Sequence, residues 1–388
     1  MIDILRQEIL TESPIIVVKV GTRILTDSTG HLSNEQIASF ARQLASAHQK
    51  GRRIVLVSSG AVGSGMGRLG LLKRPKDLAK LQATAAVGQS ALIEAYNFHF
   101  EQVGLCAAQI LLTADDFEIR TKYLNIRNTL NALLEFGAIP IINENDSLSV
   151  AELRTTFGDN DRLAALVADL IHAPLLILLS DVDGLYDGDP RNSASRVIPT
   201  VVEMDQSLQS LVHDKLGGLS KGGMASKLRI ARQITSGGGS VIIANGRTPG
   251  ILERILNAEN YGTLFLPQGG KITAKKQWIG YAVAPHGSVA VDDGCVEALA
   301  LRGKSLLPIG IRSVAGEFER GDIIAIFTLN GLEIARGLTN YSSKELRKIC
   351  GRKSDEIQTI FPHREIYEEV VHRDNLTITQ PLVHAKGE

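Results

Sequence analysis

The sequence has no long hydrophobic run and few cysteines. None of its apolar stretches approaches the ~20 residues of a membrane-spanning helix. Residues 1–14, MIDILRQEILTESP, mix charged and apolar side chains where a signal peptide would be continuously apolar. The three cysteines, Cys106, Cys295 and Cys350, lie far apart without metal-binding or redox spacing. We therefore expect a cytoplasmic protein with free thiols.

An excess of charge of either sign is also missing. Lysine and arginine together number 42, and so do aspartate and glutamate. Net charge therefore favours neither a nucleic-acid partner nor a membrane surface, and any site that handles an anion must be local. The length of 388 residues allows two or three domains, each with its own core.

Two common nucleotide-binding signatures are incomplete. Residues 218–224, GLSKGGM, come closest to a P-loop but have methionine where its lysine belongs. Gly65, Gly67 and Gly70 match the dinucleotide pattern G-x-G-x-x-G, yet they lie beyond the tight turn that should directly follow a strand. No acidic residue about 20 positions later ends a second strand. We therefore discount both a P-loop and a nicotinamide site.

Between residue 15 and about residue 267, short β-branched runs alternate with longer helical patterns. Helices are predicted over 34–50 and 122–137, the second ending at Gly137, and over 161–172, where the apolar side chains form one stripe. The intervening runs are nearly all apolar, as parallel strands buried on both faces should be. They lie at 15–20, 53–59, 105–111, 138–143, 175–180 and 240–245. This alternation predicts an α/β fold with an open, mostly parallel sheet sandwiched by helices.

The pattern changes after about residue 285. Short strand-like runs are separated by glycine and aspartate at hairpin spacing, with Asn330-Gly331 as one turn. Residues 342–351, SSKELRKICG, predict one helix that ends at glycine. We expect an α/β domain over 1–270, a linker over 271–284, a small mainly-β domain over 285–375 and a tail over 376–388.

Three glycine-containing segments suit an anion. KVGTRI places Lys19 at a strand end, VSSGAVG places Ser59 directly after the second strand, and GGLSKGGMASK carries Lys221 and Lys227 into a helix. Glycine lets backbone N–H groups close around an anion, and a helix N-terminus adds partial positive charge. Lys19 interrupts an apolar strand, and lysine is almost never buried unless something negative meets it.

Two segments are acidic and amide-rich: NENDS at 143–147 follows the fourth predicted strand, and GDND at 158–161 opens the helix with the apolar stripe. Asp159, Asn160 or Asp161 could simply cap the following helix, which contributes about 1 kcal/mol. Calcium is a second alternative, although the spacing is not that of an EF-hand. A cap needs only one such residue, so we favour a functional site. Carboxylates beside lysines on glycine loops suit phosphoryl transfer, and a phosphate and a carboxylate would then hold Lys19.

Taken together, these segments resemble the glutamate 5-kinases, which combine an amino-acid-kinase fold with a C-terminal PUA domain. The similarity covers about residues 14–375 and is carried by segments such as VVKVGTRIL, VLVSSGAVGSG, AAVGQSALI, PIINENDS, FGDNDRLAALVA, LLSDVDGLYDGDPR and LLPIGIRSVAGEFERGD. The resemblance implies a phosphotransferase with a carboxyl acceptor. It would use ATP and Mg²⁺ to convert L-glutamate to L-glutamyl 5-phosphate, the first step of proline biosynthesis.

The resemblance also implies roles for individual residues. Lys19 and Lys227 would stabilise the transferring phosphoryl group, oriented by Asp161. Glutamate would be held by Ser59, Asp146 and Asn160. The nucleotide would be bound by Lys19, Ser180 and Asp181 and by a loop of seven residues, Lys221, Gly222, Gly223, Met224, Ala225, Ser226 and Lys227. No side chain is assigned to the metal, and we expect alanine at Asp161 or Lys227 to abolish turnover with little effect on thermal unfolding.

The chain departs from the family pattern at the nucleotide loop. Relatives usually have Gly-Thr where Ser220 and Lys221 stand, and often threonine where Ser226 stands. The extra lysine either adds a phosphate contact or points to solvent, and we favour solvent. The resemblance further implies proline feedback inhibition through residues 143–157, a homodimer or homotetramer, and transfer of the labile product to a glutamyl-phosphate reductase.

Two other functions remain open. A kinase of another small amino acid or carboxylate would share the fold. An RNA-binding protein would act through the PUA domain, but residues 275–388 carry 15 lysines and arginines and 15 aspartates and glutamates. Nucleic-acid modules usually have a basic face. We therefore expect neither nucleic acid nor a membrane as a partner.

Overall fold

The computed structural model describes residues 3–27, 30–148, 159–204, 208, 211, 223–268, 276, 278–353, 356, 357, 360, 361 and 367–379. The chain divides into two compact units, Met1–Lys271 and Ile272–Glu388. The linker over 271–284 stays a prediction, and much of it lies outside the described residues. None of the described helices is both long and apolar enough to cross a bilayer.

The described strands of the first unit form one eight-stranded sheet in the order β3-β4-β2-β1-β5-β7-β8-β6. All neighbours are parallel except β7 and β8, so the predicted α/β class is confirmed. The six predicted strands are present, each within two residues of its predicted ends, and the sequence missed only the shortest two, β6 and β8. The bounds are β1 Ile15–Val20, β2 Arg53–Ser58, β3 Ala107–Leu112, β4 Ile139–Glu144, β5 Leu175–Ser180, β6 Thr200–Val201, β7 Ser240–Asn245 and β8 Thr263–Phe265.

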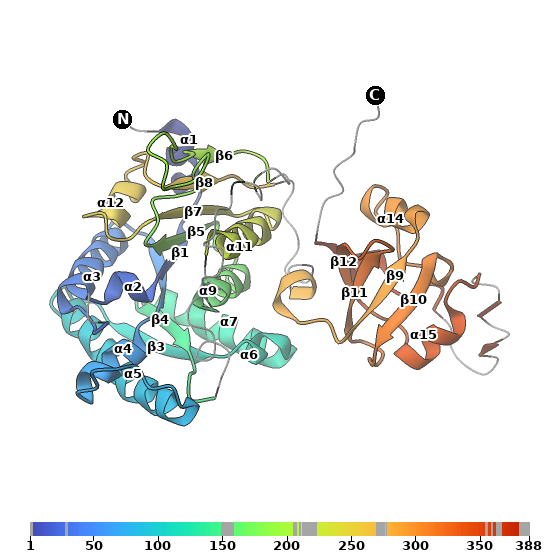
Figure 1. The fold of residues 1–388 in the computed structure, drawn as a ribbon, viewed down its shortest axis with the longest axis horizontal. Coiled ribbons are helices and arrows are strands. Elements are labelled where there is room, and N and C mark those ends of the chain that lie inside the picture. The colour runs from blue at the N-terminus through green and yellow to red at the C-terminus, as the bar shows by residue number, and fades with distance from the viewer. Residues whose placement is uncertain are drawn as a thin grey trace. The chain divides into compact units, whose positions relative to one another are not determined.

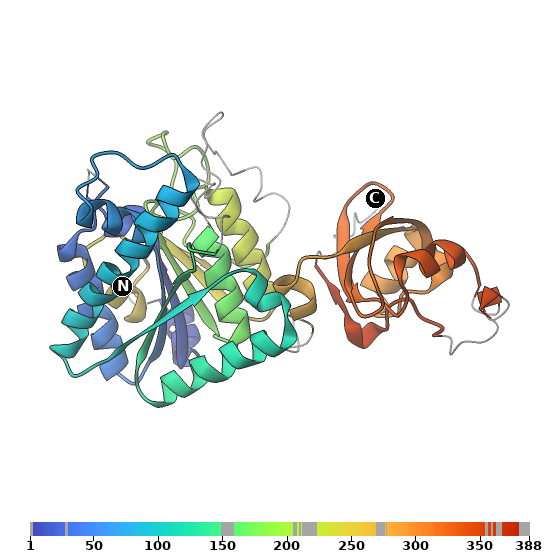
Figure 2. The same cartoon turned by 90° about the horizontal axis from the view of Figure 1, so that it is seen from below.

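Helices cover both faces of this sheet (Figures 1 and 2). On one face lie α3 (Asn34–Gln49), α5 (Leu78–Glu101) and α12 (Ile251–Leu256), and on the other lie α7 (Arg120–Glu135), α9 (Asp159–Leu170) and α11 (Met224–Ser236). The shorter described helices are α1 (Ile4–Thr11), α2 (Thr22–Leu25), α4 (Ala61–Arg68) and α6 (Asp115–Glu118). Gly137 has a φ of 73° one residue beyond the C-cap of α7, the left-handed conformation that glycine adopts without strain.

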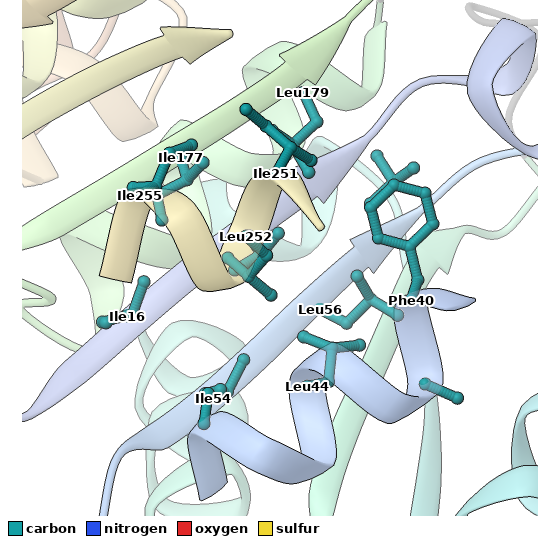
Figure 3. Close-up of a cluster of buried hydrophobic side chains, with 14 of the residues drawn as sticks. Ile16, Phe40, Leu44, Ile54, Leu56, Ile177, Leu179, Ile251, Leu252 and Ile255 are labelled. Carbon is teal, nitrogen blue, oxygen red and sulfur yellow. The ribbon is translucent and has the colours of Figure 1, made fainter. Parts of the chain in front are cut away.

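The largest core lies under α3 and α12. Figure 3 shows Phe40 and Leu44 of α3 beside Leu252 of α12, above side chains of β1, β2 and β5. Residues on these strands alternate between the two faces. Ile16 and Val18 therefore belong to this core, whereas the neighbouring Val17 and Lys19 face the side covered by α9. Lys19 is also the next-to-last residue of β1, so it lies at the carboxyl edge of the sheet.

Helices α4 and α5 touch backbone to backbone. A Cβ added to Gly65 of α4 would lie 1.8 Å from the carbonyl oxygen of Thr84, and one added to Gly88 of α5 would lie 1.8 Å from the carbonyl oxygen of Ala61. Neither position has room for a side chain. Gly65, which belongs to the incomplete dinucleotide pattern, therefore serves helix packing rather than phosphate binding.

The second unit is a mixed five-stranded sheet in the order β10-β9-β11-β12-β13, with its own hydrophobic core. The turn at Asn330-Gly331 joins β11 to β12 as predicted, with Gly331 at a φ of 82°. The predicted helix is α15, and a capping box between Ser342 and Glu345 begins it. The sequence missed α14. The bounds are β9 Gly287–Val291, β10 Ile311–Gly316, β11 Ile323–Thr328, β12 Glu333–Leu338, β13 Leu376–Ile378, α14 Asp293–Ala300 and α15 Ser343–Ile349.

The α4–α5 contact predicts a stability effect. Gly88→Ala should lower the free energy of unfolding by about 1–3 kcal/mol, because the added methyl group must push the two helices apart. The matched control is Gly67→Ala on α4, where the nearest atom to an added Cβ is 3.7 Å away. This control should be neutral or stabilise by up to about 1 kcal/mol, since alanine favours helix. Urea unfolding followed by circular dichroism measures both, and equal midpoints would contradict the close contact.

Candidate active site

The candidate site lies at the carboxyl ends of four adjacent strands, β4, β2, β1 and β5. Lys19 is the next-to-last residue of β1, and Ser180 ends β5. Ser59 follows β2, and Asn143 lies at the end of β4. Asn160 and Asp161 reach the same edge from the first turn of α9. Residues far apart in sequence therefore meet where ligands bind in open parallel sheets.

Two lysines share the carboxylate of Asp161. Lys19 Nζ lies 2.5 Å from Asp161 Oδ1, and Lys227 Nζ, from the first turn of α11, donates to Oδ2 at 2.9 Å. The side chains are 8%, 1% and 7% exposed for Lys19, Asp161 and Lys227. Lys19 can thus be buried in an apolar strand because a buried carboxylate balances its charge.

These ion pairs control the ionisation of Asp161. Burial by itself would raise the pKa of this carboxyl, but Lys19 and Lys227 together lower it to about 2. The carboxylate is therefore ionised at every physiological pH. Lys19, Asp161 and Lys227 therefore form a charged triad. Its two positive charges and one negative charge leave a net positive charge, which suits an arriving anion.

Three side-chain amides form a chain beside this triad. Asn160 Nδ2 donates to Asn143 Oδ1 at 3.0 Å, and Asn143 Nδ2 donates to Gln89 Oε1 at 2.8 Å. Asn160 Nδ2 also donates to Ser59 Oγ at 2.8 Å and to the carbonyl oxygen of Ser58 at 3.0 Å. Asn160 and Asp161 thus use their side chains away from their own helix, and the interpretation of either as a simple N-cap is wrong.

Several buried polar atoms in and around these hydrogen-bonded amides have no hydrogen-bond partner among the described residues. They are Gln89 Nε2, Asp146 Oδ1, Asn160 Oδ1 and Ser180 Oγ. An unsatisfied buried polar group costs about 1–3 kcal/mol, so such groups are rare unless a ligand completes them. Their concentration at one sheet edge marks this edge as a ligand site.

Asp146 has an unusual environment. Burial raises the pKa of its carboxyl to about 7, helped by the negative charge of Glu144 and opposed by Arg74. A carboxyl in this state can bind a cation, because an arriving ammonium group would supply the missing positive charge and favour ionisation.

The predicted nucleotide-binding residues are only partly described. Ser180 is buried near Asp181, whose carboxylate accepts from Arg23 at 2.6 Å. Lys221 and Gly222 lie outside the described residues. Gly223 is the N-cap of α11 and provides no capping side chain, so Ala225 and Ser226 of the first turn can offer backbone N–H groups to an anion.

The sequence assigned no individual role to three residues of this region, Gln89, Asn143 and Arg23, although Asn143 lies in the segment that the resemblance links to proline. Gln89 lies on the buried stripe of α5 among apolar side chains, where an amide is costly unless it has a partner. That polar interruption was a usable signal. Arg23 offered none, because its partner Asp181 lies more than 150 positions later in the chain.

A pocket of about 730 Å³ in the second unit is a different feature. It is lined by three acidic and three basic side chains, Asp292, Glu368, Glu369, Lys304, Arg312 and Arg373. None of the unpartnered buried side chains of the described residues lines it. The unpartnered groups that mark the candidate site therefore lie away from this pocket.

Comparison with protein families identifies the family of the chain. The model of the amino acid kinase family matches residues 14–245, and the PUA domain model matches residues 287–361. The chain therefore belongs to the amino acid kinase family and carries a PUA domain. The UMP kinase of Bacillus anthracis overlaps with a TM-score of 0.45 at 14% identity over 66% of this chain and 97% of that one, which is too low to add to the assignment.

Closer relatives narrow the assignment. Glutamate 5-kinase of Rhodopirellula baltica is 46% identical over 374 residues, which are 96% of each chain. Glutamate 5-kinase of Caldanaerobacter subterraneus subsp. tengcongensis is 45% identical over 94% of this chain and 98% of its own. Glutamate 5-kinase of Thioalkalivibrio sulfidiphilus is 44% identical over 93% and 96%. Within the amino acid kinase family, the chain belongs to the glutamate 5-kinases.

The buried triad revises one expectation, namely that loss of Asp161 would leave unfolding unchanged. Asp161→Asn should lower the free energy of unfolding by about 3–5 kcal/mol, because two ammonium groups lose their buried counter-charge. The folded pKa lies below the ordinary value, so this stabilisation is present above about pH 4 and lost as the pH falls toward 2. The wild-type and variant curves should therefore converge in acid.

The matched control is Asp181→Asn, whose partner Arg23 is 55% exposed. Exposed pairs contribute about 1 kcal/mol or less. Urea unfolding at pH 7 and at pH 3 measures both variants. If Asp161→Asn were as stable as Asp181→Asn at pH 7, the triad would not be a buried charge cluster.

Proposed function

We propose that the triad and the amide chain together transfer the γ-phosphoryl group of ATP to the γ-carboxylate of L-glutamate, the substrate for which the chain's relatives are named. The observation that carries this proposal is the buried carboxylate of Asp161 shared by two lysines, with unpartnered amide and carboxyl atoms beside it. One half of the site suits phosphate and the other suits an amino acid.

Glutamate occupies the polar half. Its α-ammonium group is held by Asp146, whose Oδ1 is buried and unpartnered, and by Asn160 Oδ1. Ser59, already positioned by Asn160, donates its hydroxyl hydrogen to the substrate. The γ-carboxylate then extends toward Lys19 and the phosphate.

ATP occupies the positive half. Lys19 and Lys227 contact its phosphates, and the first turn of α11 adds backbone N–H groups and partial positive charge. Ser180 Oγ, buried without a partner, and Asp181 contact the nucleotide. Lys221 and Gly222 belong to the same proposal by resemblance.

Mg²⁺ enters this site with the nucleotide. No cluster of three His, Cys, Asp or Glu side chains able to hold a metal occurs in the described part of the chain. Both oxygens of Asp161 already face lysines. Mg²⁺ usually keeps several waters and is bound through phosphates and few carboxylates, so we assign it to the phosphates. It would neutralise charge there.

The reaction needs no activated protein nucleophile. A γ-carboxylate oxygen of glutamate forms a bond to the γ-phosphorus of ATP, and the bond from that phosphorus to the bridging oxygen breaks, so ADP leaves with the electron pair. No proton moves. An anion attacks an anion, so Lys19 and Lys227 lower the barrier by cancelling repulsion and by stabilising charge on the transferring group. Asp161 keeps both ammonium groups in place.

Further properties rest on the family resemblance. Proline would inhibit through residues 143–157, of which 149–157 lie outside the described residues. The protein would act in the cytoplasm as a homodimer or homotetramer. Its product is a labile acyl phosphate, which favours direct transfer to a glutamyl-phosphate reductase.

An assay of acceptors tests the reaction. The protein is incubated with MgATP, hydroxylamine and L-glutamate, or with L-aspartate, N-acetylglutamate or carbamate in place of glutamate. We expect ADP and hydroxamate with glutamate alone. Lys227→Met should reduce turnover by at least about 100-fold, because a charge on the transferring group loses its partner, and Lys50→Met, at the exposed end of α3, should not. ADP release with another acceptor and not with glutamate would support a kinase activity but exclude glutamate as the substrate.

The environment of Asp146 predicts a pH dependence. Its pKa of about 7 means that the carboxyl is largely neutral at pH 6 and ionised at pH 8. Because the pKa of Asp146 is raised in the folded protein, the protonated carboxyl favours folding. This contribution to the free energy of unfolding is fully present below about pH 4 and is lost as the pH rises through 7. Because only the ionised form attracts an ammonium group, KM for glutamate should rise about tenfold between pH 8 and pH 6.

Asp146→Asn is the matched variant for this prediction. It should raise KM for glutamate at pH 8 and remove most of the pH dependence, while KM for ATP stays within about twofold. Initial rates at varied glutamate from pH 6 to pH 8 measure this. A wild-type KM that is constant over this range would rule out Asp146 as the ammonium partner.

A further inference from the structure

Gln89 is a buried side chain for which the triad and the residues assigned to glutamate leave no role. It lies on α5 and is 7% exposed. The other members of its buried stripe are apolar or have satisfied hydroxyl groups; Thr84 Oγ1, for example, donates to the carbonyl oxygen of Lys80 at 2.7 Å. Gln89 Nε2 has no partner among the described residues, so one end of this amide is buried without a hydrogen bond.

The orientation of the Gln89 amide follows from backbone groups at both ends of the amide chain. The Glu144 N–H can only donate, and it donates to Asn143 Oδ1 at 2.9 Å. The Ser58 carbonyl can only accept, and it accepts from Asn160 Nδ2. Asn143 must therefore donate from Nδ2 to Gln89, and Gln89 must accept through Oε1. The unpartnered atom of Gln89 is a donor by necessity.

The position of Gln89 is also fixed. Its neighbour Gly88 lies against the backbone of α4, where an added Cβ would be 1.8 Å from the carbonyl oxygen of Ala61 and 2.2 Å from the nitrogen of Gly65. Asn143 holds the far end of the side chain at 2.8 Å. Neither the backbone nor the side chain can move freely to find another partner.

The unpartnered atoms of the cluster have complementary chemistry. Asn160 Oδ1 and Asp146 Oδ1 are acceptors, whereas Gln89 Nε2 is a donor. A ligand that satisfies all three must carry both a hydrogen-bond donor and an acceptor, as the α-ammonium and α-carboxylate groups of an amino acid do. The γ-carboxylate cannot be the partner of Gln89, because it must reach the lysine triad.

We propose that Gln89 Nε2 donates a hydrogen bond to the α-carboxylate of the amino-acid substrate and so selects for substrates that carry this group. This inference rests on the proposed function. Gln89 acts in recognition and takes no part in the transfer of the phosphoryl group. Asn143 is then a positioning residue, since it orients Gln89 and Asn160 at the same time.

Gln89→Glu tests the proposal with the smallest change in shape. A glutamate keeps an oxygen for Asn143 Nδ2 and replaces the donor by an anionic oxygen that repels a carboxylate. We expect KM for L-glutamate to rise about 100-fold or more, with kcat and KM for ATP within about threefold. Gln89→Met, which removes both polar atoms, is the second variant and should raise KM for glutamate about 10- to 100-fold. Thr84→Val, a buried change on the same helix, is the control and should alter neither constant.

4-Aminobutyrate separates recognition from scaffolding. It has the ammonium and terminal carboxylate groups of glutamate but lacks the α-carboxylate. Its inhibition constant against glutamate should change less than about threefold in both Gln89 variants. A loss of equal size for glutamate and 4-aminobutyrate, or a KM for glutamate within twofold of wild type, would overturn the proposal. If the wild-type protein phosphorylated another acceptor and not glutamate, both the proposed function and this inference would be wrong. If it phosphorylated glutamate and the Gln89 variants were unaffected, only this inference would be wrong.

Discussion

The carboxylate of Asp161 holds two ammonium groups inside the protein, and the rest of the site depends on this interaction. Removing a charge from water costs several kcal/mol unless a counter-charge replaces the solvent. Lys19 in a central strand and Lys227 at the start of α11 can therefore be buried only if α9 begins at the same edge of the sheet. β1 lies between β2 and β5, which places the triad near the centre of that edge. The result is a fixed net positive charge before any ligand arrives.

The first turn of α9 contributes to both halves of the site. Asn160 and Asp161 are consecutive residues of α9, and successive side chains of a helix point about 100° apart. Asp161 turns toward the lysines, while Asn160 turns toward Ser59 and Asn143. The same backbone therefore positions the charged triad and the amides to which we assign amino-acid recognition. A change at the start of α9 would disturb both.

The buried polar atoms around this turn oppose stability and favour binding. In an ordinary hydrophobic core, apolar groups would stand in place of these polar atoms, or neighbouring groups would form hydrogen bonds with them. Here a donor on Gln89 and acceptors on Asn160 and Asp146 are left for a ligand. Asp169, farther along α9, is also buried, but it accepts from Gln233 of α11 at 2.7 Å and so ties the two helices that carry Asp161 and Lys227. Rigid support next to incomplete hydrogen bonding is typical of a preorganised site.

Local patterns in the sequence determined the strands of the parallel sheet, the stripe of α9, the turn at Asn330 and the residue types suited to phosphate, because each depends on neighbours in the chain. The short β6 and β8 were missed since two or three residues carry too little pattern. Only the tertiary structure decided which groups meet. Lys19, Asp161 and Lys227 form one charge cluster because strand order and helix packing bring them together. The chain of Gln89, Asn143 and Asn160 could not be foreseen for the same reason: hydrogen bonds depend on distance in space, and sequence alone does not specify that distance.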